Sequence, residues 1–164
     1  MIYRKSLSVA ATGMACTMLA ACASSDLVKV QPGSRGQIES IRVSRVEVVI
    51  DTPRPNPKLK QALSSELEAQ LATCARGNTP HVVRVTINEF EEQNVAKSIL
   101  IGDEIELGGK VRFTNASSGA QAGEYYVKES FYWGGLVGAA IMSNATKNLS
   151  RDFAKSVCNK VLKG

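Results

Sequence analysis

Residues 105–133 read IELGGKVRFTNASSGAQAGEYYVKESFYW, and this stretch predicts an antiparallel hairpin. Apolar and polar side chains alternate through Ile105–Phe113, which is the pattern of a strand with one buried face. The small and polar residues at 115–119, ending in Gly119, are typical of a turn. Gly123–Trp133 then alternates again as the second arm. The stretch therefore predicts two adjacent strands of a sheet.

The sequence upstream of this hairpin predicts two more strands with a helix between them. Residues 38–50 alternate in the same way, with one change of phase that indicates a β-bulge. Asn56–Pro57 is typical of a helix start, and Gly77 of a helix end. The helix between them carries an apolar stripe of four leucines: Leu59, Leu63, Leu67 and Leu71. Residues 83–87 alternate again as the next strand.

A second amphipathic helix is predicted at the end of the chain. Its apolar stripe repeats every four residues: Ala145, Leu149, Phe153, Val157 and Val161. The elements therefore follow the order β-α-β-β-β-α. A four-stranded, mostly antiparallel sheet with both helices on one face is the simplest α+β arrangement that buries both stripes.

The composition fits one globular domain of modest size. The chain has 164 residues, of which 44% are hydrophobic and 21% are charged. Its 20 basic and 15 acidic side chains give a formal charge of +5, which is too small to indicate nucleic-acid binding. His81 is the one histidine, so the sequence excludes histidine-cluster metal sites. No other pattern predicts a metal or a cofactor.

The N-terminal residues have the parts of a bacterial export signal. Two basic residues precede a mostly apolar run over residues 7–21, which has the length of a signal-peptide core and is short for a membrane span. The run ends in Leu19-Ala20-Ala21-Cys22. This segment resembles the lipobox of bacterial lipoproteins. The resemblance implies that residues 1–21 are removed and that Cys22 becomes the first residue, linked to diacylglycerol and acylated by a fatty acid such as palmitate.

Two other interpretations of this terminus stay open. Ala21-Cys22-Ala23 also fits ordinary secretory cleavage, which would release a soluble protein, and an uncleaved single-pass anchor is the other. In lipoproteins, the residue after the cysteine influences sorting. Ala23 is not the aspartate of an inner-membrane retention signal, so the resemblance implies an outer-membrane protein whose domain faces the periplasm. The mature chain would keep 18 of the 20 basic residues against 15 acidic ones, for a formal charge of +3.

Residues 22–37 predict a flexible tether between the lipid and the domain. This segment is rich in serine, glycine and proline and has few apolar side chains. The sequence thus divides into a signal peptide at 1–21, a lipidated cysteine with a tether at 22–37, and a periplasmic α+β domain at 38–164. In layout alone, this domain resembles small periplasmic lipoproteins of the lipopolysaccharide-assembly and accessory types.

Two cysteines, Cys74 and Cys158, remain besides the acylated one after processing. The periplasm is oxidising, which favours a disulfide between them. In the predicted topology both helices run in the same direction, and each cysteine lies near the C-terminal end of its helix. We therefore expect a Cys74–Cys158 bridge, with two buried reduced cysteines as the alternative.

No pattern in the sequence predicts a catalytic site. His81 could act as a base for Ser64 or Ser130, but no Gly-x-Ser-x-Gly turn presents either serine. Residues 89–92 hold three glutamates without the spacing of metal ligands. Gly108–Gly109 interrupts a strand, which is typical of a bulge or of close packing. We therefore expect a protein that is not an enzyme.

The predicted sheet leaves one face uncovered, and this face is the candidate binding site. If both helices cover the face that holds Tyr125 and Val127, alternation places a set of aromatic and basic side chains on the other face. They are Tyr126, Lys128 and Tyr132 from the last strand, and Arg84, Lys110 and Arg112 from its neighbours. Such a combination can bind a protein, a glycan or an anionic lipid head group. A solvated sheet face with no binding role is the alternative.

Two apolar stretches are the remaining unusual features, at Ser98–Gly102 and Gly134–Met142. Each is too short to span a bilayer. They are candidates for contact with the membrane or another subunit, and buried positions in the domain are the alternative.

These features together predict an outer-membrane lipoprotein with a non-catalytic periplasmic domain. The domain would bind a protein partner and assist cell-envelope assembly or maintenance. The alternative is a periplasmic lipoprotein that binds lipid or glycan. In either case the protein would contact the membrane through the lipid on Cys22.

Overall fold

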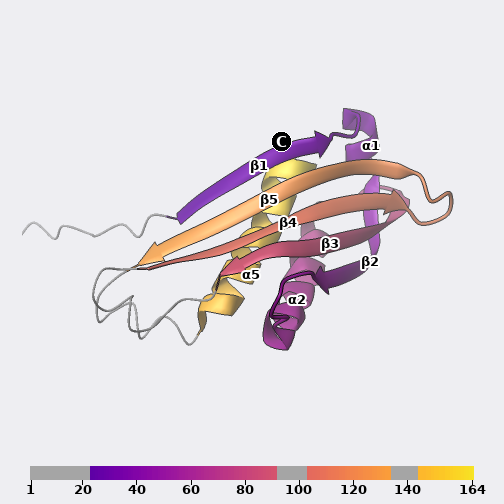
Figure 1. Ribbon diagram of the computed structural model, residues 1–164. Coiled ribbons are helices and arrows are strands. Elements are labelled where there is room, and N and C mark those ends of the chain that lie inside the picture. Colours follow the sequence, from indigo (N-terminus) through magenta and orange to yellow (C-terminus); the bar gives the residue numbers. More distant parts are fainter. Residues whose placement is uncertain (1–22, 92–102, 134–143) are drawn as a thin grey trace, which may run out of the picture.

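The fold is a single sheet with helices packed on one side, in a computed structural model that describes residues 23–91, 103–133 and 144–164 (Figure 1). Within these residues, five strands follow the order β1-β5-β4-β3-β2 across the sheet. The strands are β1 (Ala23–Gln31), β2 (Ile41–Ile50), β3 (Thr79–Glu91), β4 (Asp103–Asn115) and β5 (Gln121–Trp133). The helices are α1 (Arg35–Glu39), α2 (Pro57–Cys74) and α5 (Ala145–Ser156), which continues into the π-helical segment η2 (Val157–Leu162).

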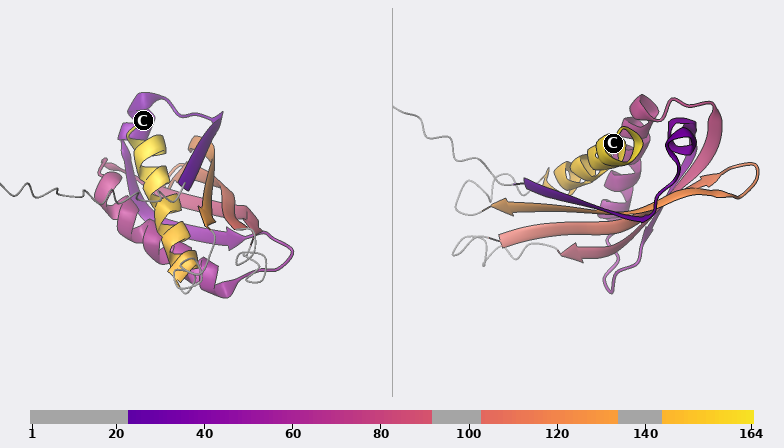
Figure 2. Two further views of the ribbon diagram at one scale, coloured as in Figure 1. Left: turned by 90° about the vertical axis from the view of Figure 1, so that its left-hand side faces the viewer. Right: turned by 90° about the horizontal axis from the view of Figure 1, so that it is seen from above.

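The arrangement of the sheet and helices confirms the predicted fold class but not the strand count. β2 and β3 are parallel and are connected through α2, whereas the other three strand pairings are antiparallel. α2 and α5 contact each other and cover the same face of the sheet (Figure 2). The predicted sheet of four strands is wrong, because the described residues form five and their order along the chain is β-α-β-α-β-β-β-α.

The additional strand, β1, lies where the sequence predicts a flexible tether. That prediction, and the domain start at residue 38, are therefore wrong. β1 pairs antiparallel with β5, with Ser24 opposite Ser130 and Leu27 opposite Val127. The Ser24 and Ser130 hydroxyl oxygens lie 2.6 Å apart. β1 lacks apolar alternation because its polar side chains meet polar partners on β5, so hydrophobic periodicity could not identify it.

Helix α2 begins where the sequence indicates. The Asn56 side chain accepts hydrogen bonds from the backbone amides of Lys58 at 2.9 Å and Leu59 at 3.0 Å, which satisfies two donors that a helix start leaves free. All four leucines of the predicted stripe are fully buried. The helix ends at Cys74, before the predicted end at Gly77. Gly77 instead donates its amide to the Ile41 carbonyl and packs tightly against the backbone of the chain just before β2.

The predicted disulfide between Cys74 and Cys158 is confirmed. It joins the last residue of α2 to η2, with the two Cα atoms 5.8 Å apart. The bridge is possible because α2 and α5 run in the same direction and each cysteine lies near its helix's C-terminal end, as the predicted topology requires.

The paired glycines of β4 occupy a site of close packing. The pairing of β3 with β4 shifts register between Ile87 and Glu89, opposite Gly108 and Gly109. A Cβ atom on Gly109 would lie 2.7 Å from the Thr86 carbonyl oxygen and 2.7 Å from the Ile87 side chain. Close packing is therefore confirmed for this dipeptide, whereas the extra residue of the bulge, Asn88, lies on the neighbouring strand β3.

Several predictions concern segments beyond the described ranges. Cys22, the signal peptide and the apolar stretches Ser98–Gly102 and Gly134–Met142 all lie outside the described residues. In the part of the chain that the structure describes, no helix combines the length and the apolar character needed to cross a membrane.

Candidate functional site

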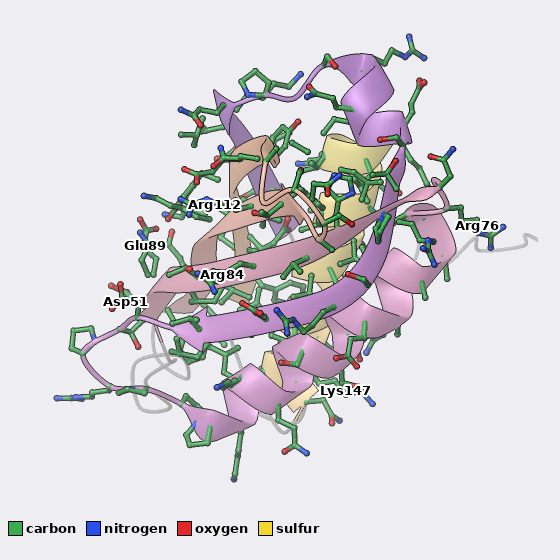
Figure 3. All side chains as sticks on the ribbon, turned by 90° about the vertical axis from the view of Figure 1, so that its right-hand side faces the viewer. Asp51, Arg76, Arg84, Glu89, Arg112 and Lys147 are labelled. Carbon is green, nitrogen blue, oxygen red and sulfur yellow. A yellow bond between two sulfur atoms is a disulfide. The ribbon has the colours of Figure 1, made fainter. Side chains whose placement is uncertain are left out.

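The sheet face opposite α2 and α5, called the open face below, carries the four basic side chains and one of the two tyrosines predicted from the sequence. Strand register places Arg84 opposite Arg112, and Lys110 opposite Tyr126. Lys128 follows Tyr126 on the same face of β5. Arg84 and Arg112 lie on the side of the sheet away from α2 (Figure 3). Tyr132 pairs with Glu104 in the backbone register, but its side chain lies outside the described part of the structure.

Most of these cations already hold a carboxylate partner. Arg84 donates to the Glu47 Oε2 atom of β2 from Nε at 3.0 Å and from Nη2 at 2.8 Å. Arg45 contacts the other oxygen of the same carboxylate at 2.7 Å. The hydrogen bond from Arg84 is the main reason that the pKa of Glu47 lies below its ordinary value, and the charge of Arg45 adds to the effect. Two arginines therefore share one acid at this edge of the sheet.

Arg112 is paired in the same way across the hairpin. It donates to Glu124 of β5 from Nε at 2.6 Å and from Nη2 at 2.5 Å. The Glu124 side chain is only 10% exposed, whereas that of Arg112 is 47% exposed. The guanidinium thus lies over the carboxylate and neutralises it.

Lys128 forms the third ion-pair group. Its ammonium lies 3.1 Å from Glu106 and 3.4 Å from Glu89. The hydrogen bond to Glu106 raises the pKa of Lys128. Tyr126 lies next to this group with its hydroxyl above Gly108, where any Cβ atom would collide with it at 2.5 Å. Burial, together with the nearby charge of Glu89, raises the pKa of Tyr126, so its phenol stays neutral.

The open face is thus a ladder of cross-strand ion pairs rather than a surface of free positive charge. Lys110 is exposed and has no ion-pair partner among the described residues. Val28 and Val49 lie on the same face by register and are 58% and 46% exposed. A hollow of about 300 Å³ opens between the three arginines of this face, Arg45, Arg84 and Arg112. A partner protein matches this mixture of paired charges and exposed apolar side chains better than a small anion does.

A buried polar cluster on the opposite face was not found from the sequence. Glu129 is only 5% exposed and accepts a hydrogen bond from Ser25 Oγ at 2.5 Å. Lys160 donates to the same Ser25 oxygen at 2.6 Å, and Ser156 Oγ lies 2.9 Å from it. The cluster ties β1 and β5 to α5 and η2. The sequence does contain one indication of this cluster, because Glu129 is an acid placed between Val127 and Phe131 on the apolar side of β5.

The pKa of Glu129 is raised above its ordinary value of 4.5, chiefly by burial, although hydrogen bonds from Ser156 and Ser25 and the charge of Lys160 act against the shift. A raised folded-state pKa means that the folded protein holds this proton more tightly than the unfolded chain. Unfolding free energy should therefore fall as the pH rises from about 4.5 through the raised pKa. Glu129→Gln should flatten this part of the profile in urea titrations at a series of pH values.

The exposed acid Glu68 on α2 provides the matched control for this experiment. Glu68→Gln removes the same kind of carboxylate at an exposed position, so it measures what the change in net charge alone does to stability at each pH value. Indistinguishable profiles for the wild type and Glu129→Gln would contradict the prediction.

The candidate catalytic groups do not come together. His81 is buried, and its Nδ1 donates to the Thr79 carbonyl at 2.8 Å. The Ser130 hydroxyl is hydrogen-bonded to Ser24, and Glu89 is engaged with Lys128. Across the described ranges, no group of three or more histidine, cysteine, aspartate or glutamate side chains could hold a metal ion.

Comparison with known proteins gives a fold but no family. The sequence matches no protein-family model and no curated protein. A Xanthomonas campestris protein of the DUF330 family is similar in structure, with a TM-score of 0.51 and 10% identity over 84% of this chain and 93% of that one. A candidate lipoprotein from Caulobacter crescentus gives a TM-score of 0.50 and 13% identity over 79% of this chain and 92% of that one. The chain shares their fold.

Proposed function

We propose that this protein is a lipoprotein anchored through Cys22 in the outer membrane, and that its periplasmic domain is a non-catalytic binding module that assists envelope assembly or maintenance. The lipobox at Leu19–Cys22 supports the anchor. The structural similarity to a candidate lipoprotein from Caulobacter crescentus is in keeping with it.

The observation that carries the binding role is the open face itself. No described element packs over it, although it presents exposed valines and an ordered set of ion pairs. A partner that is complementary in charge could form ion pairs with the charged side chains of the open face while it covers Val28 and Val49. The alternative ligands, anionic lipid and glycan, have less support at this face because Arg84, Arg112 and Lys128 already have carboxylate partners.

Site-specific crosslinking in intact cells tests the binding role. A photo-reactive amino acid at Lys110 should capture a protein of discrete mass, because this side chain is exposed at the centre of the open face. The matched control is Lys60, which is exposed on α2 on the other side of the sheet. Absence of an adduct at 110, or the same adduct at 60, would count against the open face as the partner site.

The intact mass of the mature protein from the membrane fraction tests the anchor separately. A mass equal to residues 22–164 plus acyl groups is the expected result. An unlipidated soluble product would contradict the anchor without affecting the crosslinking result.

A further inference from the structure

A second hollow lies at the outer edge of the sheet, between β2 and the C-terminal half of α2. Its volume is about 530 Å³. Its apolar floor is formed by Leu71 and Ala75, which are buried, and by Val43 and Val46, which are half-buried. Its exposed lining consists of Ala72, Arg42, Arg45, Arg76 and Glu68. The hollow therefore has three arginines against one acid at its exposed rim, above an apolar floor.

Two arginines at this rim are available for an anionic partner. Arg42 and Arg76 pair across an isolated antiparallel bridge, which places their side chains next to each other. Both residues are exposed, and neither has an ion-pair partner in the described ranges. Arg45, by contrast, is paired with Glu47. Adjacent guanidinium groups bind carboxylates strongly because each can donate two parallel hydrogen bonds.

The same hollow borders an open strand edge. β2 is the last strand of the sheet, and its first residues are capped by the Gly77 amide, which donates to the Ile41 carbonyl. Farther along, the Asp51 amide donates to the Ile87 carbonyl of β3. Alternate residues of a strand direct their backbone groups to opposite sides. Because the amide of Asp51 is directed toward β3, the backbone groups of Val46 and Val48, at positions of the other parity, are directed away from β3 toward the free edge. These donors and acceptors are a template for another strand.

From these observations we propose that the edge of β2 binds an extended, acidic segment of a protein partner. The segment adds a strand beside Val46 and Val48 through backbone hydrogen bonds. Its carboxylates pair with Arg42 and Arg76, and an apolar side chain next to them contacts the floor at Val43. Arg45 lines both hollows, but Arg42 and Arg76 line only this one, and Lys110, the crosslinking position, lines neither, so a test of one site does not decide the other.

Fluorescence anisotropy with the purified full-length protein in detergent tests the proposal. The probe is a fluorescein-labelled peptide in which glutamate alternates with valine or threonine. The double variant Arg42→Glu/Arg76→Glu should weaken its binding by about tenfold or more, because both charge-assisted contacts become repulsive. The matched control Lys58→Glu/Lys60→Glu makes the same change in net charge at exposed positions of α2 and should bind as the wild type does.

A proline variant separates strand addition from simple charge attraction. Val46→Pro removes one edge amide, which an edge strand tolerates, and it should weaken peptide binding while Arg42 and Arg76 stay in place. Thermal unfolding shows whether each variant is folded. If Val46→Pro does not fold, the double arginine variant still tests whether peptide binding depends on Arg42 and Arg76.

Three results would overturn the proposal. Absence of peptide binding would mean that the register shift of β2 between Val43 and Arg45, together with the arginines, only protects the edge. Competition by inorganic phosphate, with no effect of Val46→Pro, would indicate a small-anion site. Arginine-dependent binding to phosphatidylglycerol vesicles in place of the peptide would indicate a membrane contact.

Discussion

Replacing Cys74 and Cys158 together by serine should lower the free energy of unfolding by about 4–5 kcal/mol. The bridge joins residues separated by 84 positions, and closing so long a loop removes much of the conformational entropy of the unfolded chain. It also holds the ends of α2 and η2 together at one end of the helical layer. Urea denaturation at constant pH measures the change as a shift in the transition midpoint.

The wild-type protein under reducing conditions is the internal control for this variant. Its stability should fall to that of the double serine variant, and reductant should leave the variant unchanged. Equal midpoints for the oxidised and reduced wild type would show that the bridge contributes little.

Gly109→Val should destabilise the protein by about 3 kcal/mol or more, at the upper end of the range for overpacked cores. The first added carbon would already lie 2.7 Å from the Thr86 carbonyl oxygen, which belongs to the backbone of the neighbouring strand and cannot rotate away. The two remaining carbons of valine would press against Ile87, which is fully buried. The same denaturation experiment measures the loss.

Gly36 provides the matched control for the glycine substitution. It lies in α1, and a Cβ atom there would meet nothing within 4 Å. Gly36→Ala should therefore be neutral or slightly stabilising, because alanine favours the helix more than glycine does. Similar effects at positions 36 and 109 would contradict the assignment of Gly109 to a packing constraint.

The predicted parts of the fold are those in which local pattern and tertiary packing agree. The leucine stripe of α2 and the alternation in β3, β4 and β5 identify both buried faces, because each of these elements packs against the core along most of its length. The disulfide was predictable for a related reason, since strand order alone makes the two helices run in the same direction. β1 was not predictable, because its place in the sheet depends on polar contacts such as Ser24 with Ser130.

The candidate site was predictable in position but not in charge. Alternation alone places Arg84, Arg112 and Lys128 on the open face. The acids that neutralise them lie on other strands, and their distances depend on register: Glu47 faces Arg84 only because β2 and β3 pair at that offset. A count of basic residues on one face therefore overestimates its free charge whenever the neighbouring strands carry acids in register.

β1 also determines how a mechanical load would enter the molecule. Its first residue, Ala23, directly follows the cysteine that we propose carries the lipid, and its pairing with β5 extends to Gln31. Hydrogen bonds between antiparallel strands lie perpendicular to the strands. A pull along β1, between the membrane and the domain, would therefore load these bonds together, in shear, instead of straightening slack chain. With the lipid on Cys22, tension between the membrane and the domain would pass directly into the sheet. The edge of β5 would become exposed only when β1 detached as a unit.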